Sequence, residues 1–227
     1  MRWDNMLVAC IVLGFLIAGV KAAEDTKPVE LDKSFKSDFA VDKANLAATG
    51  RNPYFVLEPG FVIVLEGGSE KVTITVKDET KKVDGVECRV VEEHETKDGK
   101  VTEISNNYFA IDKQTNDLYY FGEDAGGAWL SGEKGARFGL MLPGKPTDKD
   151  KYYQEIAPGV ALDRAEHKSL TETVKTPAGE FKDCLKVEET TQLEPGKGYK
   201  VYAPGVGLIQ DGKLKVVKYG KAEDVKK

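Results

Sequence analysis

Apolar and polar residues alternate with a period of two along most of this chain. The pattern is clearest between Lys71 and Lys77, where valine or isoleucine alternates with lysine or threonine. A period of two places one row of side chains on each face of a β-strand. Similar runs, rich in β-branched and aromatic residues, occupy 86–95, 101–111, 117–121, 152–157, 160–168, 181–191, 199–203, 206–210 and 214–219. The pattern predicts an all-β protein.

The breaks between these runs have the chemistry of tight turns. Asp-Gly pairs at 84–85, 98–99 and 211–212 are typical of two-residue hairpin turns with positive φ. Five of the nine prolines precede glycine, which suits type II turns. Short runs joined by short turns favour a single antiparallel meander, because parallel neighbours need long crossovers. Ten or more such strands should curl, so we expect a half-barrel or barrel, with a two-sheet β-sandwich as the alternative.

The region before the strands departs from this pattern. Residues 41–48, closed by Gly50, have the spacing of one short helix. Residues 24 to about 37 are polar and lack periodicity, which predicts a mobile leader. The expected organisation is therefore a polar leader with a short helix over 23–50, a β-domain over 51–219 and a polar tail over 220–227.

An apolar run precedes the leader. Arg2 comes before the run 6–20, and Ala22 and Ala23 follow it. A basic residue, a short apolar core and small residues at its end are typical of a secretory signal peptide, whereas a membrane span needs about 20 residues. We expect removal of residues 1–22 and a periplasmic or extracellular location without a stable membrane span. The alternative is an uncleaved N-terminal anchor. Cys10 ends a lipobox-like sequence but lies inside the apolar core, so lipidation is not expected.

The net charge of the chain limits the kinds of molecule that it can bind. The chain holds 33 basic and 38 acidic residues, a formal net charge of −5, scattered along its length. An acidic protein lacks the basic surface that nucleic acid requires, so no nucleic-acid partner is expected. The sequence contains no nucleophile elbow and no phosphate-binding loop. It therefore nominates no catalytic residue and no cofactor.

Four segments carry a resemblance. They are NPYFVLEPG (52–60), YFGED (120–124), APGVALDRAE (157–166) and YAPGVGL (202–208). Together they resemble a family of uncharacterised exported bacterial β-proteins. The last segment, with TPAGEF (176–181) before it, is also similar to the end of TapB-like domains of unknown function. The resemblance implies an envelope or secreted location and an antiparallel β fold, and it implies no catalytic residues.

Aromatic residues and one arginine are candidates for ligand binding. Tyr119, Phe121 and Tyr153 belong to an aromatic-rich part of the chain and either line a ligand pocket or form core and cross-strand pairs. Arg164 either holds a ligand carboxylate through its planar fork or pairs with Glu166 on the same strand face.

A metal site is the next candidate. Glu92 and His94 lie two residues apart on a predicted strand, so both project from one face. If that face is the inner one, they form a site for a divalent ion with Asp163 or His167 as further ligands. The alternative is a solvated strand end.

Cys88 and Cys184 are the cysteines that remain after processing. An exported pair is a candidate disulfide. However, the alternation places Cys88 in an apolar row and Cys184 in a polar row between Lys182 and Lys186, and cysteines on opposite faces of one sheet cannot bridge. A disulfide and two separate buried thiols both remain open.

These observations favour an exported cell-envelope β-domain that binds an apolar or other small ligand, or an envelope protein, without catalysis. Two alternatives remain. One is a carboxylate-dependent hydrolase, because carboxylates are plentiful. The other is a structural or assembly component that pairs with another chain through a sheet edge.

Overall fold

The computed structural model describes residues 30–125 and 127–225, so the predicted signal peptide lies outside the described residues. The main strands are β4 (Phe61–Gly67), β5 (Glu70–Val83), β6 (Val86–Lys97), β7 (Lys100–Asp112), β8 (Leu118–Glu123), β10 (Arg137–Leu142), β11 (Lys151–Tyr153), β12 (Glu155–Ile156), β13 (Asp163–Thr176), β14 (Gly179–Thr191), β15 (Gly198–Ala203), β16 (Gly207–Asp211) and β17 (Leu214–Lys221). The shorter elements are η1 (Lys43–Asn45), β1 (Leu46–Ala47), β2 (Gly50–Asn52), β3 (Phe55–Leu57), β9 (Trp129–Leu130) and α1 (Ala222–Val225).

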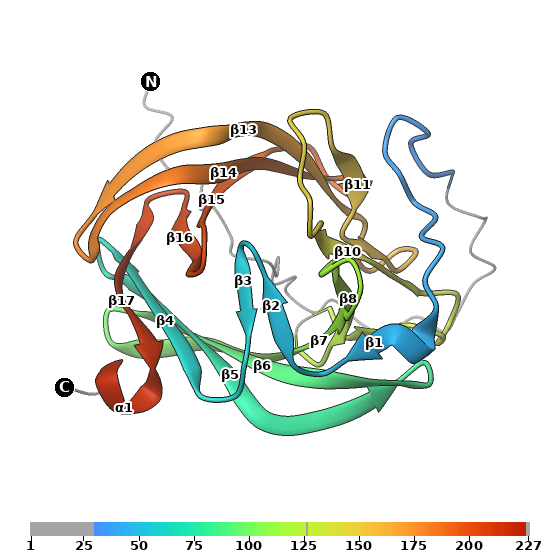
Figure 1. The fold of residues 1–227 in the computed structure, drawn as a ribbon, viewed down its shortest axis with the longest axis horizontal. Coiled ribbons are helices and arrows are strands. Elements are labelled where there is room, and N and C mark those ends of the chain that lie inside the picture. Colours follow the sequence, from blue (N-terminus) through green and yellow to red (C-terminus); the bar gives the residue numbers. More distant parts are fainter. Residues whose placement is uncertain (1–29, 126, 226–227) are drawn as a thin grey trace.

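The main strands form one nearly closed antiparallel sheet, in the order β11-β13-β14-β15-β16-β17-β4-β5-β6-β7-β8-β10-β12 (Figure 1). Two meanders, β4 to β8 and β13 to β17, are joined where β17 pairs with β4. Asp84-Gly85 and Asp98-Gly99 form hairpin turns with positive φ, as the sequence predicts. The predicted all-β, barrel-like meander is confirmed, and the sandwich alternative is not what forms.

A single short segment closes the barrel. Residues 151–156 pair with β13 through β11 and with β10 through β12, and the two strands are separated by Gln154. The first and last strands of the path are therefore consecutive in the chain. Glycine is required at position 139 on β10, because a Cβ there would lie 2.3 Å from the carbonyl oxygen of Gln154.

The hairpin of β2 and β3 lies within the ring of strands (Figure 1), and we call it the plug. The amide of Asn52 donates to the carbonyl oxygens of Asn116 (2.8 Å) and Pro143 (3.1 Å), which follow β7 and β10. The hydroxyl of Tyr54 donates to the carbonyl oxygen of Asp183 on β14, 3.1 Å away. The plug thus connects separate parts of the wall, and its Leu57 is fully buried in the main apolar core.

The start of the described chain differs from the expected leader. The helix expected over 41–48 is a single 3-10 turn, η1, capped by Asp42, and the chain then enters β1, which pairs with β7. Residues 31–39, which we call the strap, lie outside the ring beside β10 and β11 (Figure 1). Leu31 and Phe35 pack on apolar side chains of the wall, so this part of the leader is held by packing.

The expected polar tail forms regular structure over 220–225. Gly220 and Lys221 complete β17, where they pair with Val62 and Phe61 of β4. The four-residue helix α1 follows. Backbone pairing with β4 therefore extends the β-domain beyond the boundary expected at residue 219.

Candidate functional site

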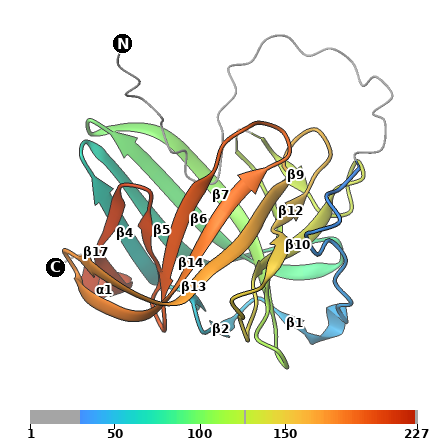
Figure 2. The ribbon, with the colours of Figure 1, turned by 90° about the horizontal axis from the view of Figure 1, so that it is seen from above.

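Figure 2 shows β9 and β12 at the end of the barrel away from β1 and β2. Carboxyl groups that are buried or half-buried gather on the inner wall. They come from five strands: Glu93 on β6, Glu123 on β8, Glu155 on β12, Asp163 on β13 and Glu189 on β14. Together with Tyr120, Gln154 and Lys200 we call these residues the acidic chamber. Glu93, Glu123 and Glu155 are each no more than 5% exposed. Buried carboxyls are rare in proteins unless they are paired or functional.

Lys200 is the basic residue of the chamber. Its Nζ lies 2.7 Å from Glu189 Oε2 and 4.0 Å from Asp211 Oδ2. Burial by itself lowers the pKa of Lys200, but the surrounding carboxylates outweigh that effect and raise the pKa well above its usual value. Lys200 is therefore a buried ammonium held by carboxylates.

The carboxyls on the other side of the chamber lack such a partner. Within the described residues, no Lys or Arg lies in ion-pair contact with Glu123, Glu155 or Asp163. Burial and neighbouring carboxyls raise the pKa of Glu123 to about 8 and push that of Glu155 well above its usual value. Burial also raises the pKa of Asp163, whose side chain is hydrogen-bonded to that of Glu155. Burial therefore favours the protonated, uncharged forms of these carboxyls.

Aromatic side chains complete this side of the chamber. Tyr120 donates its hydroxyl hydrogen bond to Glu123 (3.1 Å) or Asn107 (2.5 Å), and the indole nitrogen of Trp129 donates to Glu155 (2.8 Å). The rings of Tyr120 and Trp129 pack edge to face with centroids 5.4 Å apart. Carboxylates beside aromatic rings are the groups that recognise ammonium ions.

A small cavity lies among these groups, with roughly the space that one water molecule needs. Its lining residues are Tyr120, Met141, Gln154, Glu155, Asp163, Glu189 and Lys200. Because most of these residues are polar, the cavity suits a hydrated or charged occupant rather than an apolar one.

Sequence reasoning did not find this chamber, because local alternation fails where it forms. Tyr152 and Gln154 point inward and Tyr153 outward, as alternation requires, but Glu155 also points inward because the strand breaks at Gln154. On β6, Glu93 is the inward residue. Two signals were present in the sequence: glutamates within three residues of tyrosines, at Glu123 and Glu155, and Lys200 within an otherwise apolar run.

The predicted ligand residues lie on the outer face instead. Tyr119 packs against Phe39 of the strap, with ring centroids 6.0 Å apart, and Tyr153 packs against Phe35 at 6.1 Å. Arg164 lies over the Phe35 ring at 4.7 Å. Phe121 stacks on Phe138 of β10. The structure gathers these residues near the strap, so the chain's own strap covers the predicted ligand surface.

The predicted metal site is not assembled. Glu92 and His94 lie on the outer face of β6, because Glu93 between them points inward, and Glu92 pairs with Lys77 at 3.3 Å. Asp163 faces the opposite, inner side. Among residues 30–125 and 127–225, no group of three His, Cys, Asp or Glu side chains is placed to hold a metal ion.

The two cysteines are free and fully buried. Cys184 was expected in a polar row, but Asp183 before it adopts a positive φ of 54° and disturbs the strand, so Cys184 and Leu185 are both buried. Burial raises the pKa of Cys88 to about 12 and that of Cys184 to about 11. Both side chains therefore belong to the core as neutral thiols.

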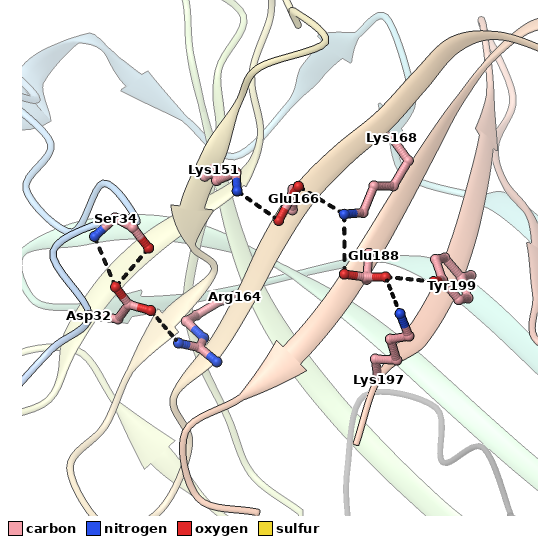
Figure 3. A network of polar contacts seen from close by, with 9 residues as sticks. All are labelled: Asp32, Ser34, Lys151, Arg164, Glu166, Lys168, Glu188, Lys197 and Tyr199. Carbon is pink, nitrogen blue, oxygen red and sulfur yellow. Dashed lines mark hydrogen bonds and ion pairs between the residues drawn. The ribbon is translucent and has the colours of Figure 1, made fainter. Parts of the chain in front are cut away.

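The outer face of β13 to β15 carries an ion-pair network (Figure 3). Glu188 accepts hydrogen bonds from Tyr199 (2.5 Å) and Lys197 (3.0 Å) and pairs with Lys168 at 3.2 Å. These contacts lower the pKa of Glu188 to about 2. Arg164 does not pair with Glu166, which instead contacts Lys168. The outer network is thus fully charged, in contrast to the chamber.

No protein-family model matches the chain, and no curated protein matches it at a significant level. Two solved structures share a distant likeness. One is a "putative lipoprotein" from Parabacteroides distasonis, 14% identical, with 76% of this chain and 100% of that chain covered and a TM-score of 0.44. The other is the hypothetical protein CT021 from Chlamydia trachomatis, 14% identical, covering 73% of this chain and 88% of that one, with a TM-score of 0.26. Both TM-scores are too low to support a functional inference, and the resemblance drawn from the sequence motifs stays a prediction.

No helix in the described part of the chain is both long and apolar enough to cross a membrane.

Proposed function

We propose that this chain is an exported, non-catalytic binding domain that takes up a small organic cation, such as a primary ammonium, in the acidic chamber. The observation that carries the proposal is a set of three carboxyls near Tyr120 and Trp129: the buried Glu123 and Glu155 and the half-buried Asp163. None of the three is in ion-pair contact with a basic side chain of the described residues. Isolated buried carboxyls destabilise a fold, so their concentration at one end of the barrel favours a functional role.

Lys200 supports the choice of ligand. Its ammonium already occupies one side of the same chamber, where Glu189 and Asp211 hold it. A second ammonium placed among Glu123, Glu155 and Asp163 would find equivalent oxygen acceptors together with aromatic rings. An apolar ligand has less support, because the lining of the chamber cavity is mostly polar and charged.

The binding test uses calorimetry with ammonium and methylammonium, which are small enough for the chamber cavity, at pH 8. We expect binding to release protons, because a bound cation favours the ionised carboxylates, and the measured heat should therefore vary with the ionisation enthalpy of the buffer. The double variant Glu155→Gln/Asp163→Asn should weaken binding at least tenfold. Glu166→Gln, on the outer face of β13, is the matched control and should leave binding unchanged. Absence of amine binding at millimolar concentration, or full binding by the double variant, would refute the proposal.

One observation favours hydrolysis as a second candidate. Glu155 and Asp163 are hydrogen-bonded to each other beside a polar cavity, both with a raised pKa, and such pairs perform acid–base chemistry in other proteins. Assays with chromogenic glycosides and esters test it: turnover that disappears in Glu155→Gln would replace the binding proposal. Assembly through a sheet edge is a third candidate, because one edge of β11 pairs with no other strand of the main sheet.

Export is part of the proposal and rests on the apolar run 6–20 followed by Ala22 and Ala23. Fractionation of the native cells, followed by N-terminal sequencing, tests it. We expect a mature chain that begins at Ala23 outside the cytoplasm. A chain with an intact N-terminus recovered from the cytoplasm would contradict this prediction.

A further inference from the structure

The strap covers an apolar surface of the outer wall, distinct from the acidic chamber, which we call the strap groove. Tyr153, Ile156 and Leu162 form its floor and are at most 2% exposed. Leu31 and Phe35 of the strap pack on this floor, yet no strap residue is itself fully buried. The strap therefore shields a well-formed apolar floor while remaining accessible to solvent.

The strap binds as an added strand. Lys36 donates its backbone N–H to the carbonyl oxygen of Lys151, and its own carbonyl accepts from the N–H of Tyr153, both at 2.9 Å. These two bonds use the edge of β11 that does not pair with β13, in a parallel bridge. Addition of a strand to a free sheet edge is a common mode of peptide recognition, because backbone bonds supply affinity for any sequence and side-chain pockets supply specificity.

Two arginines of the groove form ion pairs with two aspartates of the strap. Arg164 Nη1 lies 3.1 Å from Asp32, and Arg137 Nη1 lies 3.2 Å from Asp38 (Arg164 and Asp32 are shown in Figure 3). Arg164 also lies over the ring of Phe35. The groove therefore recognises an apolar residue, an acidic residue after it and an aromatic residue three positions further on.

The strap does not use all of this recognition surface. The Nε of Arg164 is buried and has no hydrogen-bond partner among the described residues, because Asp32 reaches one nitrogen only. A carboxylate that engaged the guanidinium through two nitrogens would satisfy this group, and bidentate pairs are the stronger ones. A segment with a longer acidic side chain at this position would fit better than the strap does.

We propose that the strap groove is a docking site for an extended segment of a partner protein, with an acidic side chain for Arg164 and an aromatic one for the Phe35 position, and that the strap is its displaceable resident occupant. Two observations favour a partner of this kind: the arginines of the groove attract acidic side chains, and Arg164 Nε still lacks a hydrogen-bond acceptor among the described residues. A tethered strap competes at a millimolar effective concentration, so the groove stays closed to weak competitors.

The test uses a fluorescein-labelled peptide of residues 30–40 as the probe and the full chain as the receptor. Phe35→Ser in the chain should weaken the packing of the strap on the groove. The labelled peptide should then bind this variant at least tenfold more tightly than it binds the unaltered chain. Lys33→Ala, at an exposed strap position, is the matched control and should leave peptide binding at the unaltered level. In the Phe35→Ser background, Arg164→Gln should weaken the peptide about tenfold, and a peptide carrying Asp32→Glu should bind more tightly than the native one.

The melting temperature and far-UV circular dichroism of the Phe35→Ser chain show whether the barrel stays folded. A folded Phe35→Ser chain that does not bind the peptide would overturn the proposal, because the strap would then be a fixed part of the fold. A concentration-dependent dimer of the unaltered chain in native mass spectrometry would overturn the partner assignment, because the strap of a second copy would then be the occupant.

Discussion

The two ends of the barrel interior are buried to a similar degree but with opposite chemistry. At the plug, Leu57 and Val56 are at most 2% exposed and lie in the apolar core. In the acidic chamber, Glu93 and Lys200 are at most 5% exposed. Burial of apolar area stabilises a fold at any pH, whereas burial of carboxyls destabilises the charged form and makes stability depend on pH. The apolar residues at the plug contribute to stability, which is sufficient reason for their burial. The buried carboxyls of the chamber do not contribute in this way.

The cavities at the two ends follow the same division. Beside the plug, the lining is almost entirely apolar: Phe55, Val56, Phe61, Ile63, Ile74, Val76, Gly207 and Leu208. In the chamber the lining is mostly polar and charged. An apolar cavity of this size stays dry, but a polar one holds water or an ion. This difference is the reason why we propose binding at the chamber and not at the plug.

Removal of the chamber's lysine should have the largest effect. Lys200→Met leaves Glu189 and Asp211 without their buried ammonium, and loss of one partner of a buried pair destabilises by about 3–5 kcal/mol. We expect a loss of this size at pH 8 and a smaller one at pH 5, where protonation relieves the carboxylates. Urea denaturation at both pH values measures it. Lys182→Met, at an exposed position, is the control. Equal losses of stability at the two pH values would contradict the conclusion that the chamber makes stability depend on pH.

Truncation at the plug should come next. Leu57→Ala opens a cavity in a fully buried site and should lower the free energy of unfolding by about 3 kcal/mol. Because no ionisable group is involved, the loss should be the same at pH 5 and pH 8. The same denaturation series measures it, with Leu193→Ala, at a 45% exposed position, as the control. A loss that varied with pH would show that the two ends are coupled.

The pH dependence of stability should come from the chamber. Burial raises the pKa of Glu93 to about 8, so the folded state holds a proton that the unfolded state releases near its ordinary pKa. The free energy of unfolding should therefore be highest below about pH 5 and fall as the pH rises to 8, by up to about 1.4 kcal/mol per pH unit for each such carboxyl. Glu93→Gln should flatten this slope, and Glu92→Gln on the outer face should not. An unchanged slope in Glu93→Gln would assign the effect to other groups.

The outer network should have the smallest effect and the opposite sign. Because the pKa of Glu188 is lowered to about 2, its stabilisation is present above the ordinary glutamate pKa and disappears as the pH falls toward 2. Its partner Lys197 is exposed, so Glu188→Gln should destabilise by less than about 1 kcal/mol at pH 6 and by almost nothing at pH 2. Thermal melts with and without 1 M NaCl measure it. A loss that salt does not reduce would contradict a screened surface network.

Much of the fold could be predicted, because strands and hairpin turns depend on residues close together in sequence. The alternation at 71–77 and the turn at Asp84-Gly85 both appear in β5 and its connection to β6. Whether a row of polar side chains faces the inside or the outside of the barrel could not be predicted from the sequence in the same way. One irregular residue reverses the parity of a strand, as Gln154 does before Glu155 and Asp183 does before Cys184.

The alternation of this chain determined by itself that it forms antiparallel strands in sequential order, since a period of two and tight turns permit little else. Tertiary structure alone decided which rows face inward, where the carboxyls of five strands converge, and that Leu31 and Phe35 pack on β11 and its neighbours. The physical reason is that the two kinds of interaction act over different distances along the chain. Strand and turn propensities act over a few residues, whereas barrel closure and the hydrogen bond between Glu155 and Asp163 depend on distances that are set only once the sheet has curled.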